Sequence, residues 1–278
     1  MSADSPGVPE LLKLYRIKPD KRLGQNFLID RTALTRVVEA SAVGPGDEVL
    51  EVGAGLGSLT RLLAETCRRV VAIELDERLI SPLKDQITGY ENVQIIHGDI
   101  LGIDPGALFD PPGYAVVATI PYYLTSALIR HLLEADRRPG LLALTVQREV
   151  AERICEQPGS LSLLALSVQV YGKPDIRWRI PAGAFYPAPK VDSAVVRISL
   201  YPSPRVPESM LPTFFRLAKA GFSQKRKTLR NALAGGMRWS KDEATDYLLA
   251  AGIDPHRRAQ TVSIDEWGAL STRVADRQ

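Results

Sequence analysis

The chain has few of the residues that build disulfide frameworks and metal centres. Its 278 residues include two cysteines, Cys67 and Cys155, and three histidines, at positions 97, 131 and 256. The cysteines lie far apart, and neither acids nor cysteines accompany the histidines at metal-ligand spacing. We therefore expect neither a structural disulfide nor a bound metal, and we expect both thiols to be small packed residues in a reducing compartment.

Long apolar segments are missing as well. The sequence contains no apolar run near 20 residues, and its start is not a charged segment followed by an apolar one. These absences argue against a transmembrane helix and against a secretory leader. We therefore expect a soluble, cytoplasmic protein that does not bind a membrane. We also expect it to be a monomer. A loose tail is expected over residues 1–10, where Ser, Pro and Gly are frequent.

The chain does contain a regular alternation of apolar runs and helix-like segments. Its length and its hydrophobic content of 45% are enough for one large domain and a small appendage. Apolar runs typical of buried strands occur near residues 48–52, 70–75, 93–97, 115–119 and 141–147. Helical patterns separate these runs, and the first helix is expected over residues 31–40 with Asp30 as its N-cap. This alternation predicts an α/β domain built on a parallel, doubly wound sheet.

The rest of the chain is expected to close that sheet and then to become helical. Helices are expected over about 147–153 and 161–170, and strands near 175–180 and 193–200. A proline-containing linker at 202–207 then precedes four helical segments, at residues 210–220, 225–234, 241–251 and 264–274. We therefore expect a cofactor-binding domain over residues 1–204 and a small all-helical domain over residues 205–278.

A glycine-punctuated turn follows the first expected strand. The segment Glu51-Val-Gly53-Ala-Gly55-Leu-Gly57 leaves an apolar run and opens a helix at Ser58. The glycines let the backbone approach a ligand, and the amide groups at the helix start face the same space. The third glycine comes one position earlier than in the dinucleotide-binding fingerprint, which argues against a nicotinamide dehydrogenase. Glu51 would repel a diphosphate but stabilise an ammonium group, and S-adenosylmethionine carries one.

Two further expected strands also end in acids. Glu74 lies about 20 residues beyond the glycine turn, where a carboxylate can accept hydrogen bonds from both ribose hydroxyls. Asp99 ends the next strand and is placed to accept a hydrogen bond from the adenine amino group. Either acid alone could be a solvated strand end or a helix cap, and the turn alone could be an ordinary strand-to-helix connection. Three acidic strand ends around one glycine turn favour a cofactor site.

The fourth expected strand runs into Thr119-Ile-Pro121-Tyr122-Tyr123, which suits methyl transfer to an amino group. The lone pair of an exocyclic amine on a base is delocalised into the ring, so a site has to hold both N–H bonds with oxygen acceptors. The proline turn presents a backbone carbonyl, and Thr119 offers a side-chain oxygen. The Tyr122 ring offers a face on which a flipped base can stack. The alternative is a structural proline turn with two packed tyrosines.

These segments resemble the small-subunit ribosomal RNA adenine dimethyltransferases, the kasugamycin-sensitivity enzymes, over nearly the whole chain. Besides the glycine turn, the shared segments are Leu23-Gly-Gln-Asn26-Phe-Leu28, Ile73-Glu74-Leu-Asp76, Gly98-Asp99, Ile120-Pro-Tyr-Tyr123, Ala184-Phe185-Tyr-Pro-Ala-Pro-Lys190-Val-Asp-Ser-Ala-Val-Val196, Phe222-Ser-Gln-Lys-Arg-Lys-Thr-Leu-Arg230-Asn231, and Gly252-Ile-Asp-Pro through Arg258-Ala-Gln. The later segments are the more diagnostic because many methyltransferases share the first half. The resemblance implies a class I methyltransferase fold, in which an antiparallel strand closes a Rossmann-like, mostly parallel sheet, together with a small all-α carboxyl-terminal domain.

The resemblance also implies roles for individual residues. Asn26, Leu28, Gly53, Glu74 and Asp99 would bind S-adenosylmethionine, while Phe185 and Tyr122 would hold the target adenine. Together with the residues argued from the sequence itself, the candidate cofactor set is Asn26, Leu28, Glu51, Gly53, Gly55, Gly57, Glu74, Asp99 and Thr119. The candidate catalytic set is Thr119, Pro121, Tyr122 and Phe185.

The implied activity is methyl transfer to the 6-amino groups of two adjacent adenosines near the 3′ end of small-subunit (16S) ribosomal RNA, during ribosome biogenesis. The family has Asn where this chain has Thr119, which is shorter by about one bond and carries a β-branched methyl group. Two alternatives stay open. A large-subunit adenine methyltransferase of the macrolide-resistance type is opposed by the segment from Gly252 to Gln260. An RNA-binding assembly factor with weak or lost catalysis is kept open by Thr119.

Charge is unevenly distributed along the chain. Residues 1–204 carry 22 Lys/Arg against 24 Asp/Glu, whereas residues 205–278 carry 13 against 8, a net charge of +5. One basic run lies near the amino terminus and another on a helix-like stretch of the second domain. The candidate RNA-binding residues are Lys21, Arg22, Lys225, Arg226, Lys227 and Arg230. A solvated helix face is the alternative for either run.

Overall fold

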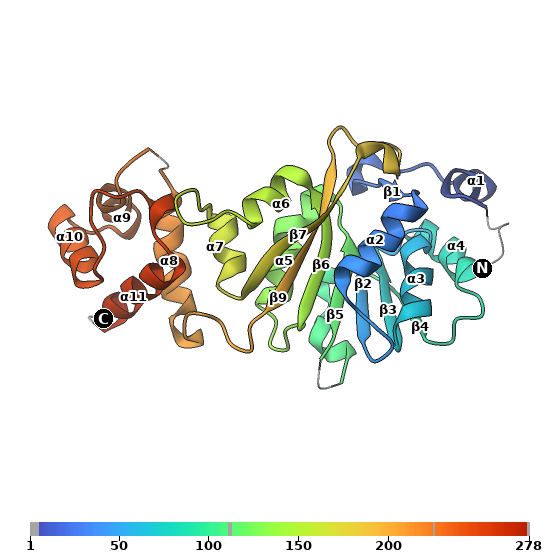
Figure 1. Cartoon of the computed structure of the whole chain (residues 1–278), viewed down its shortest axis with the longest axis horizontal. Coiled ribbons are helices and arrows are strands. Elements are labelled where there is room, and N and C mark those ends of the chain that lie inside the picture. Colours follow the sequence, from blue (N-terminus) through green and yellow to red (C-terminus); the bar gives the residue numbers. More distant parts are fainter. Residues whose placement is uncertain (1–5, 111–112, 225, 277–278) are drawn as a thin grey trace. The chain divides into compact units, whose positions relative to one another are not determined.

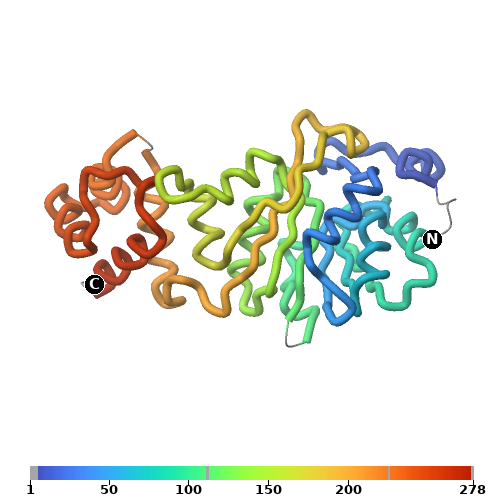
Figure 2. The backbone as a smooth tube through the Cα atoms, in the orientation of Figure 1, coloured from blue at the N-terminus to red at the C-terminus, as the bar shows by residue number. Residues whose placement is uncertain are grey.

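The computed structural model describes residues 6–110, 113–224 and 226–276. The chain forms two compact units (Figures 1 and 2). Unit 1 comprises Met1–Ala151 and Asp175–Leu200, and unit 2 comprises Glu152–Pro174 and Tyr201–Gln278. The sequence predicts a single boundary at residue 204. Unit 2 also includes residues 152–174 because helix α7 (Leu163–Gln169) packs against helix α8 (Leu211–Phe222).

Unit 1 is built around a seven-stranded sheet. Its strands are β2 (Glu48–Val52), β3 (Arg69–Glu74), β4 (Val93–His97), β5 (Ala115–Thr119), β6 (Leu141–Gln147), β7 (Gly172–Ile180) and β9 (Ser193–Leu200). The spatial order is β4-β3-β2-β5-β6-β9-β7. The pairs β2–β3, β3–β4, β2–β5 and β5–β6 are parallel, whereas β9 runs antiparallel to β6. The expected parallel, doubly wound sheet with an antiparallel closing strand is therefore confirmed.

Burial explains why these segments form the centre of the fold. Strands covered on both faces have to be apolar throughout, and Leu50, Val71 and Val116 are fully buried accordingly. Helices α2 (Arg31–Ser41) and α3 (Ser58–Thr66) pack against one face of the sheet. Helix α4 (Glu77–Gln86) packs at the β3–β4 edge, and helix α5 (Thr125–Leu133) lies behind the sheet in Figure 1. The strand order reverses between β2 and β5, where such sheets bind ligands.

Helix α1 (Val8–Leu14) corrects the expectation of a loose tail. Val8, Leu11 and Leu12 are buried, and they pack against Leu56 and Leu79. The expectation over residues 1–10 is therefore wrong from Val8 onward, because apolar side chains at helical spacing pack against Leu56 in the glycine turn and Leu79 in the helix at 77–86. Residues 1–5 lie outside the described residues.

A second, two-stranded sheet joins segments far apart in the sequence. Strand β1 (Phe27–Leu28) pairs antiparallel with β8 (Phe185–Tyr186), with Leu28 opposite Phe185. The Ile29 N–H also donates to the Ala184 carbonyl at 2.9 Å. The sequence did not predict this sheet, which places a candidate cofactor residue beside a candidate base-binding residue.

Unit 2 is helical. Besides α7, α8 and part of α6 (Arg148–Ile154), it contains α9 (Leu229–Met237), α10 (Lys241–Ala250) and α11 (Ile264–Ala275), packed around the fully buried Phe214 and Trp267. The helix predicted over residues 225–234 begins later, at Leu229, because Thr228 has the extended backbone of an N-cap. Among the described residues, no helix combines the length and the apolar character that a membrane span requires.

Candidate active site

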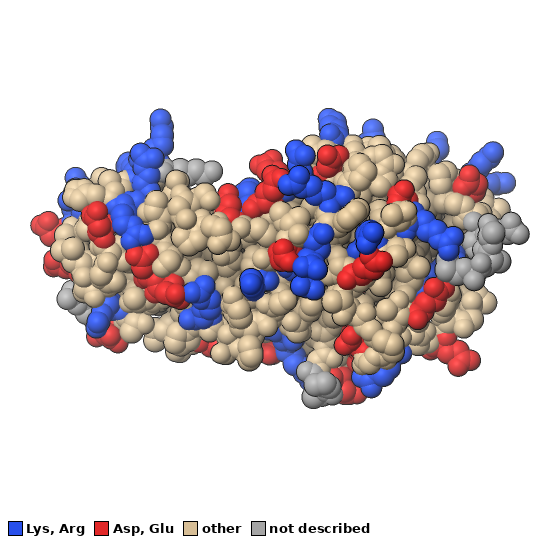
Figure 3. Space-filling view, viewed as in Figure 1, with Lys and Arg blue, Asp and Glu red and all other residues tan. Residues whose placement is uncertain are grey.

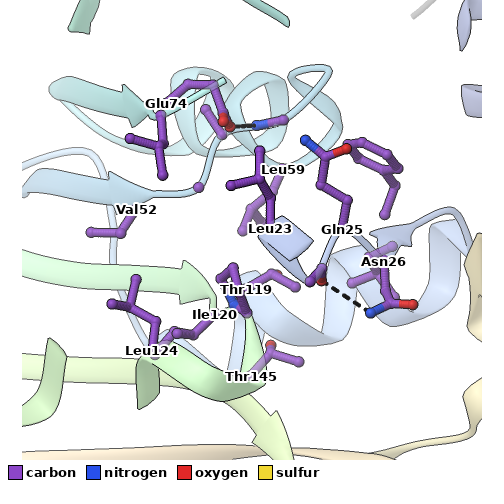
Figure 4. Close-up of a pocket in the computed structure, with 18 of the residues that line it drawn as sticks. Leu23, Gln25, Asn26, Val52, Leu59, Glu74, Thr119, Ile120, Leu124 and Thr145 are labelled. Atoms are coloured by element: carbon purple, nitrogen blue, oxygen red, sulfur yellow. Dashed lines mark hydrogen bonds between the residues drawn. The ribbon is translucent and has the colours of Figure 1, made fainter. Parts of the chain in front are cut away.

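A pocket lies at the carboxyl ends of the central strands, where the strand order reverses (Figure 4). It is lined by nearly all the candidate cofactor and catalytic residues: Asn26, Leu28, Glu51, Gly53, Gly55, Glu74, Asp99, Thr119, Pro121, Tyr122 and Phe185. Gly57 does not line it. The carboxyl ends of the parallel strands lie at one edge of the sheet. This arrangement brings together side chains that are separated in sequence by up to about half the chain.

The backbone of the glycine turn adopts conformations that favour glycine. Gly53, Gly55 and Gly57 have φ values of 79°, 60° and 83°, a region that side chains other than glycine rarely adopt. A Cβ atom on Gly55 would lie 3.2 Å from the Phe27 ring, and one on Gly57 would lie 2.9 Å from Leu83 Cδ1. Gly57 is also the N-cap of α3. A glycine at this position therefore allows both the close packing of the turn and the start of the helix.

Glu51 is a buried acid without a hydrogen-bond partner among the described residues. Its side chain is 1% exposed, and neither carboxylate oxygen is bonded. Burial raises the pKa of Glu51 to about 8, an effect that the nearby Thr60 hydroxyl partly opposes. The Thr60 hydroxyl does not form a hydrogen bond to Glu51 in the structure, and it has no other hydrogen-bond partner among the described residues. A buried carboxyl group of this kind is costly unless a ligand of opposite charge completes it.

Glu74 is held by the backbone around it. Its Oε2 accepts a hydrogen bond from the Gly55 N–H at 2.7 Å, and its Oε1 accepts one from the Asp76 N–H at 2.8 Å. Burial raises the pKa of Glu74, and these two backbone donors act in the opposite direction. Each carboxylate oxygen keeps a further lone pair, so Glu74 is fixed in place and can still accept from a ligand.

Asp99 lies at the exposed end of the pocket. Its Oδ1 accepts from the Leu101 N–H at 3.0 Å, so Asp99 caps a short 3₁₀ helix (Ile100–Gly102). The cap that the sequence left as an alternative is therefore present, and Asp99 also lines the pocket. Its second oxygen remains available to a ligand.

The proline turn after β5 carries the candidate catalytic residues. The Pro121 carbonyl accepts from the Leu124 N–H at 2.9 Å, whereas the Ile120 carbonyl accepts no backbone hydrogen bond among the described residues. Tyr122 Oη lies 2.9 Å from Ser193 Oγ, which fixes the ring on the side of β9. Burial raises the pKa of Tyr122, so its hydroxyl is neutral at ordinary pH.

Sequence reasoning did not single out three residues that line or organise the pocket. Gln25 Nε2 donates to Asp76 Oδ2 at 2.7 Å, which ties the segment before β1 to the end of β3. Thr145 ends β6, and Ser193 begins β9. Gln25 and Ser193 lie within segments that carry the family resemblance, whereas Thr145 joins the pocket only because β6 lies beside β5.

The amino-terminal basic run lies beside the pocket within unit 1. Lys21 and Arg22 are exposed on a short 3₁₀ helix (Lys21–Leu23), and Leu23 lines the pocket. Arg22 forms an ion pair with Asp20 at 3.1 Å, so part of its charge is neutralised locally. Lys21 has no such ion pair among the described residues.

The basic run of unit 2 was expected on a helix, but among its described residues only Arg230 lies on one. Arg226 and Lys227 are exposed in the turn before α9, whereas Arg230 is within α9 and half-buried, its Nε lacking a partner. Lys225 lies outside the described residues. On the face drawn in Figure 3, basic and acidic side chains are interleaved. Nowhere in the described part of the chain do three or more His, Cys, Asp or Glu residues form a group that could hold a metal ion.

Comparisons with known proteins show the family to which the chain belongs. The family model for ribosomal RNA adenine dimethylase matches residues 17–276. The ribosomal RNA small subunit methyltransferase A of Dehalococcoides mccartyi strain CBDB1 is 45% identical over 269 residues, which cover 96% of this chain and 92% of that protein. The protein of the same name from Alkaliphilus metalliredigens is 38% identical, with 96% of each chain covered.

Two solved structures share the fold. The 23S rRNA methyltransferase ErmE is 28% identical with a TM-score of 0.72, covering 90% of this chain and 100% of its own. A dimethyladenosine transferase from Plasmodium falciparum is 24% identical with a TM-score of 0.76, covering 90% and 98%. The class I methyltransferase fold expected from the sequence is confirmed. With a family model matched over nearly its whole length and relatives this similar, the chain belongs to the ribosomal RNA adenine dimethylase family.

Proposed function

We propose that this protein transfers methyl groups from S-adenosylmethionine to the 6-amino groups of two adjacent adenosines near the 3′ end of small-subunit ribosomal RNA. The relatives named above as small subunit methyltransferases support this substrate. One observation carries the assignment: a single pocket joins a buried carboxyl group without a partner, Glu51, to the proline turn with its two oxygen acceptors.

The residues of the pocket fit S-adenosylmethionine. Glu51 offers two unpartnered oxygens to the ammonium group of its methionine part, and the glycine turn leaves the backbone open beside it. Glu74 can accept from the ribose hydroxyls through its remaining lone pairs, and Asp99 is placed near the adenine end. When bound, the cofactor supplies an activated methyl group on a sulfonium centre.

The remaining residues position the target amine. The Ile120 carbonyl and the Thr119 hydroxyl accept its two N–H bonds, because neither oxygen has a hydrogen-bond partner among the described residues. The Pro121 carbonyl already accepts one hydrogen bond, from the Leu124 N–H, and keeps one lone pair. Tyr122 and Phe185 hold the base, and pairing with Leu28 links Phe185 to the cofactor side of the pocket. Positioning and the exclusion of water account for the rate, so no general base is needed.

Binding to RNA is assigned to the two basic runs. Lys21 and Arg22 lie next to the pocket, and Arg226 and Lys227 are exposed on unit 2, where they can neutralise phosphates. The protein acts as a monomer in the cytoplasm on the assembling small subunit.

Mass spectrometry of ribosomal RNA after incubation with the protein and labelled S-adenosylmethionine tests the function. Small and large subunits lacking adenine methylation are offered separately. We expect dimethylated adenosine at two adjacent positions of the small-subunit RNA. Labelled adenosine in the large-subunit RNA alone would favour the macrolide-resistance type of activity. Tight RNA binding without transfer would favour an assembly factor.

A further inference from the structure

Thr119 and Thr145 end neighbouring strands at the same level of the sheet. They are register partners in the parallel pair β5–β6. Side chains that face each other across a ladder point to the same side of the sheet, and neighbouring strands lie about 4.8 Å apart. Both residues line the pocket, and in Figure 4 the Thr145 hydroxyl lies on the side that faces Thr119.

The two hydroxyl groups share an unusual state. Thr119 Oγ1 and Thr145 Oγ1 are both buried, and neither has a hydrogen-bond partner among the described residues. Thr145 is 1% exposed and interrupts an otherwise apolar run, Leu141 to Val146. A valine at position 145 would have nearly the same shape as threonine but no hydroxyl group. A buried hydroxyl group without a hydrogen-bond partner lowers the free energy of unfolding. Because both hydroxyls also line the pocket, a ligand bound there can complete them.

We propose that Thr119 and Thr145 act as one hydroxyl pair that receives the amino group of the target adenine. This proposal rests on the function proposed above and assigns Thr145 as a positioning residue. A single threonine hydroxyl has to place its own proton elsewhere before its lone pair can face an N–H donor. The two hydroxyls are not hydrogen-bonded to each other in the structure, so a rotation of the side chains about χ1 has to bring them together. Thr145 then accepts that proton from Thr119, which turns a lone pair of Thr119 Oγ1 toward the amine.

The geometry of the turn makes the pair complementary to the substrate. The amine has two N–H bonds to donate. The Ile120 carbonyl, which accepts no backbone hydrogen bond among the described residues, receives one, and the hydroxyl pair receives the other.

A double-mutant cycle tests the pair. Thr119→Val, Thr145→Val, the double variant and Thr145→Ser are compared with the parent in single-turnover methylation of small subunits. We expect each valine variant to lose about tenfold in rate, and the double variant to lose about tenfold as well, because groups that act as a unit are not additive. Thr145→Ser should keep most of the rate. The affinity for S-adenosylhomocysteine, measured by calorimetry, should stay unchanged in Thr145→Val and Thr145→Ser.

A matched control separates positioning from a structural effect. Thr125 at the start of α5 is also a buried threonine whose hydroxyl has no partner, but it does not line the pocket. Thr125→Val should leave the methylation rate at the parent value. Neither Thr125→Val nor Thr145→Val should lower the melting temperature, because each replaces an unpaired hydroxyl by a methyl group.

The possible failures are distinguishable. If the parent transfers no methyl group to adenosine, the proposed function falls. If the parent is active but Thr145→Val is equally fast, or if the two valine substitutions multiply their losses to about a hundredfold, the hydroxyl pair is overturned while the function stands. A loss of cofactor affinity in Thr145→Val, or failure of Thr145→Ser to keep the rate, would also overturn it.

Discussion

Glu51 is a carboxyl group whose charge depends on what else occupies the pocket. Burial without a partner raises its pKa to about 8, so the acid is mostly neutral in the free protein at pH 7. An ammonium group beside it would favour the carboxylate and lower that pKa. Binding of S-adenosylmethionine at neutral pH should therefore be coupled to the loss of a proton from Glu51.

This coupling gives a pH dependence with a definite sign. Cofactor affinity should rise between pH 6 and pH 8, since the free protein has to lose fewer protons on binding as the pH approaches the pKa of about 8. Calorimetry in two buffers with different ionisation enthalpies should detect proton release at pH 7. In Glu51→Gln both the proton release and the rise with pH should vanish. Binding without proton release in the parent would show that Glu51 does not meet the ammonium group.

Glu74 offers a second test at the residue scale. Its carboxylate is fixed by the Gly55 and Asp76 backbone, so Glu74→Ala removes both the ribose acceptor and a support of the glycine turn. Cofactor binding should weaken by about 2–3 kcal/mol, which is roughly 30- to 150-fold. Glu77→Ala, an exposed acid in the first turn of α4, serves as the control and should bind like the parent. An unchanged dissociation constant in folded Glu74→Ala would remove Glu74 from the site.

Among the elements, helix α1 stabilises the region around the glycine turn. Leu11 is buried against the cluster that includes Leu56 and Leu79, while Leu14 on the same helix is 68% exposed. Leu11→Ala should cost about 2–5 kcal/mol of unfolding free energy, as buried leucines generally do. Leu14→Ala should melt within a degree or two of the parent, since exposed substitutions change little. Equal melting temperatures for both variants would contradict the packing of α1.

The same elements show what the sequence could and could not predict. The central strands were predictable because fully buried parallel strands are continuous apolar runs, and Asp30 caps α2 as expected, accepting from the Ala33 N–H at 2.7 Å. Helix α1 was missed because it is one short apolar stretch next to Gly7 and Pro9. The β1–β8 sheet was missed because two-residue strands have no periodicity to detect.

The residues of the site also fall into those that the sequence could predict and those that it could not. Glu51, Glu74 and Thr119 were predictable because the carboxyl ends of parallel strands meet at one edge. Thr145 and Ser193 belong to the pocket only because β6 lies beside β5 and β9 beside β6, a matter of tertiary pairing. The start of α9 was placed too early because the basic residues before Leu229 fit a helix locally, while the backbone of Thr228 begins the helix.

For the molecule as a whole, charge is divided between the two units. Unit 2 carries 15 Lys/Arg against 10 Asp/Glu, whereas unit 1 carries 20 against 22. An excess of five positive charges on the helical unit favours a polyanion such as RNA. Basic and acidic side chains are interleaved on the face drawn in Figure 3, so net charge alone does not show which basic residues bind RNA. The number of phosphates that a basic run contacts can be measured from the salt dependence of RNA binding.

The salt dependence of RNA binding tests that contribution. Arg226 and Lys227 are exposed in the turn before α9, so replacing both by Ala should remove about two phosphate contacts. The slope of log affinity against log salt should become shallower by roughly 1.5 units, because each phosphate contact contributes about 0.7–0.9. The double variant Lys84→Ala with Lys241→Ala removes the same charge from exposed positions elsewhere and should keep the parent slope.

Filter binding over a salt series measures both variants, and S-adenosylmethionine affinity should stay at the parent value in each. If the Arg226 and Lys227 variant keeps the parent slope, these side chains are a solvated turn and the RNA contacts lie elsewhere.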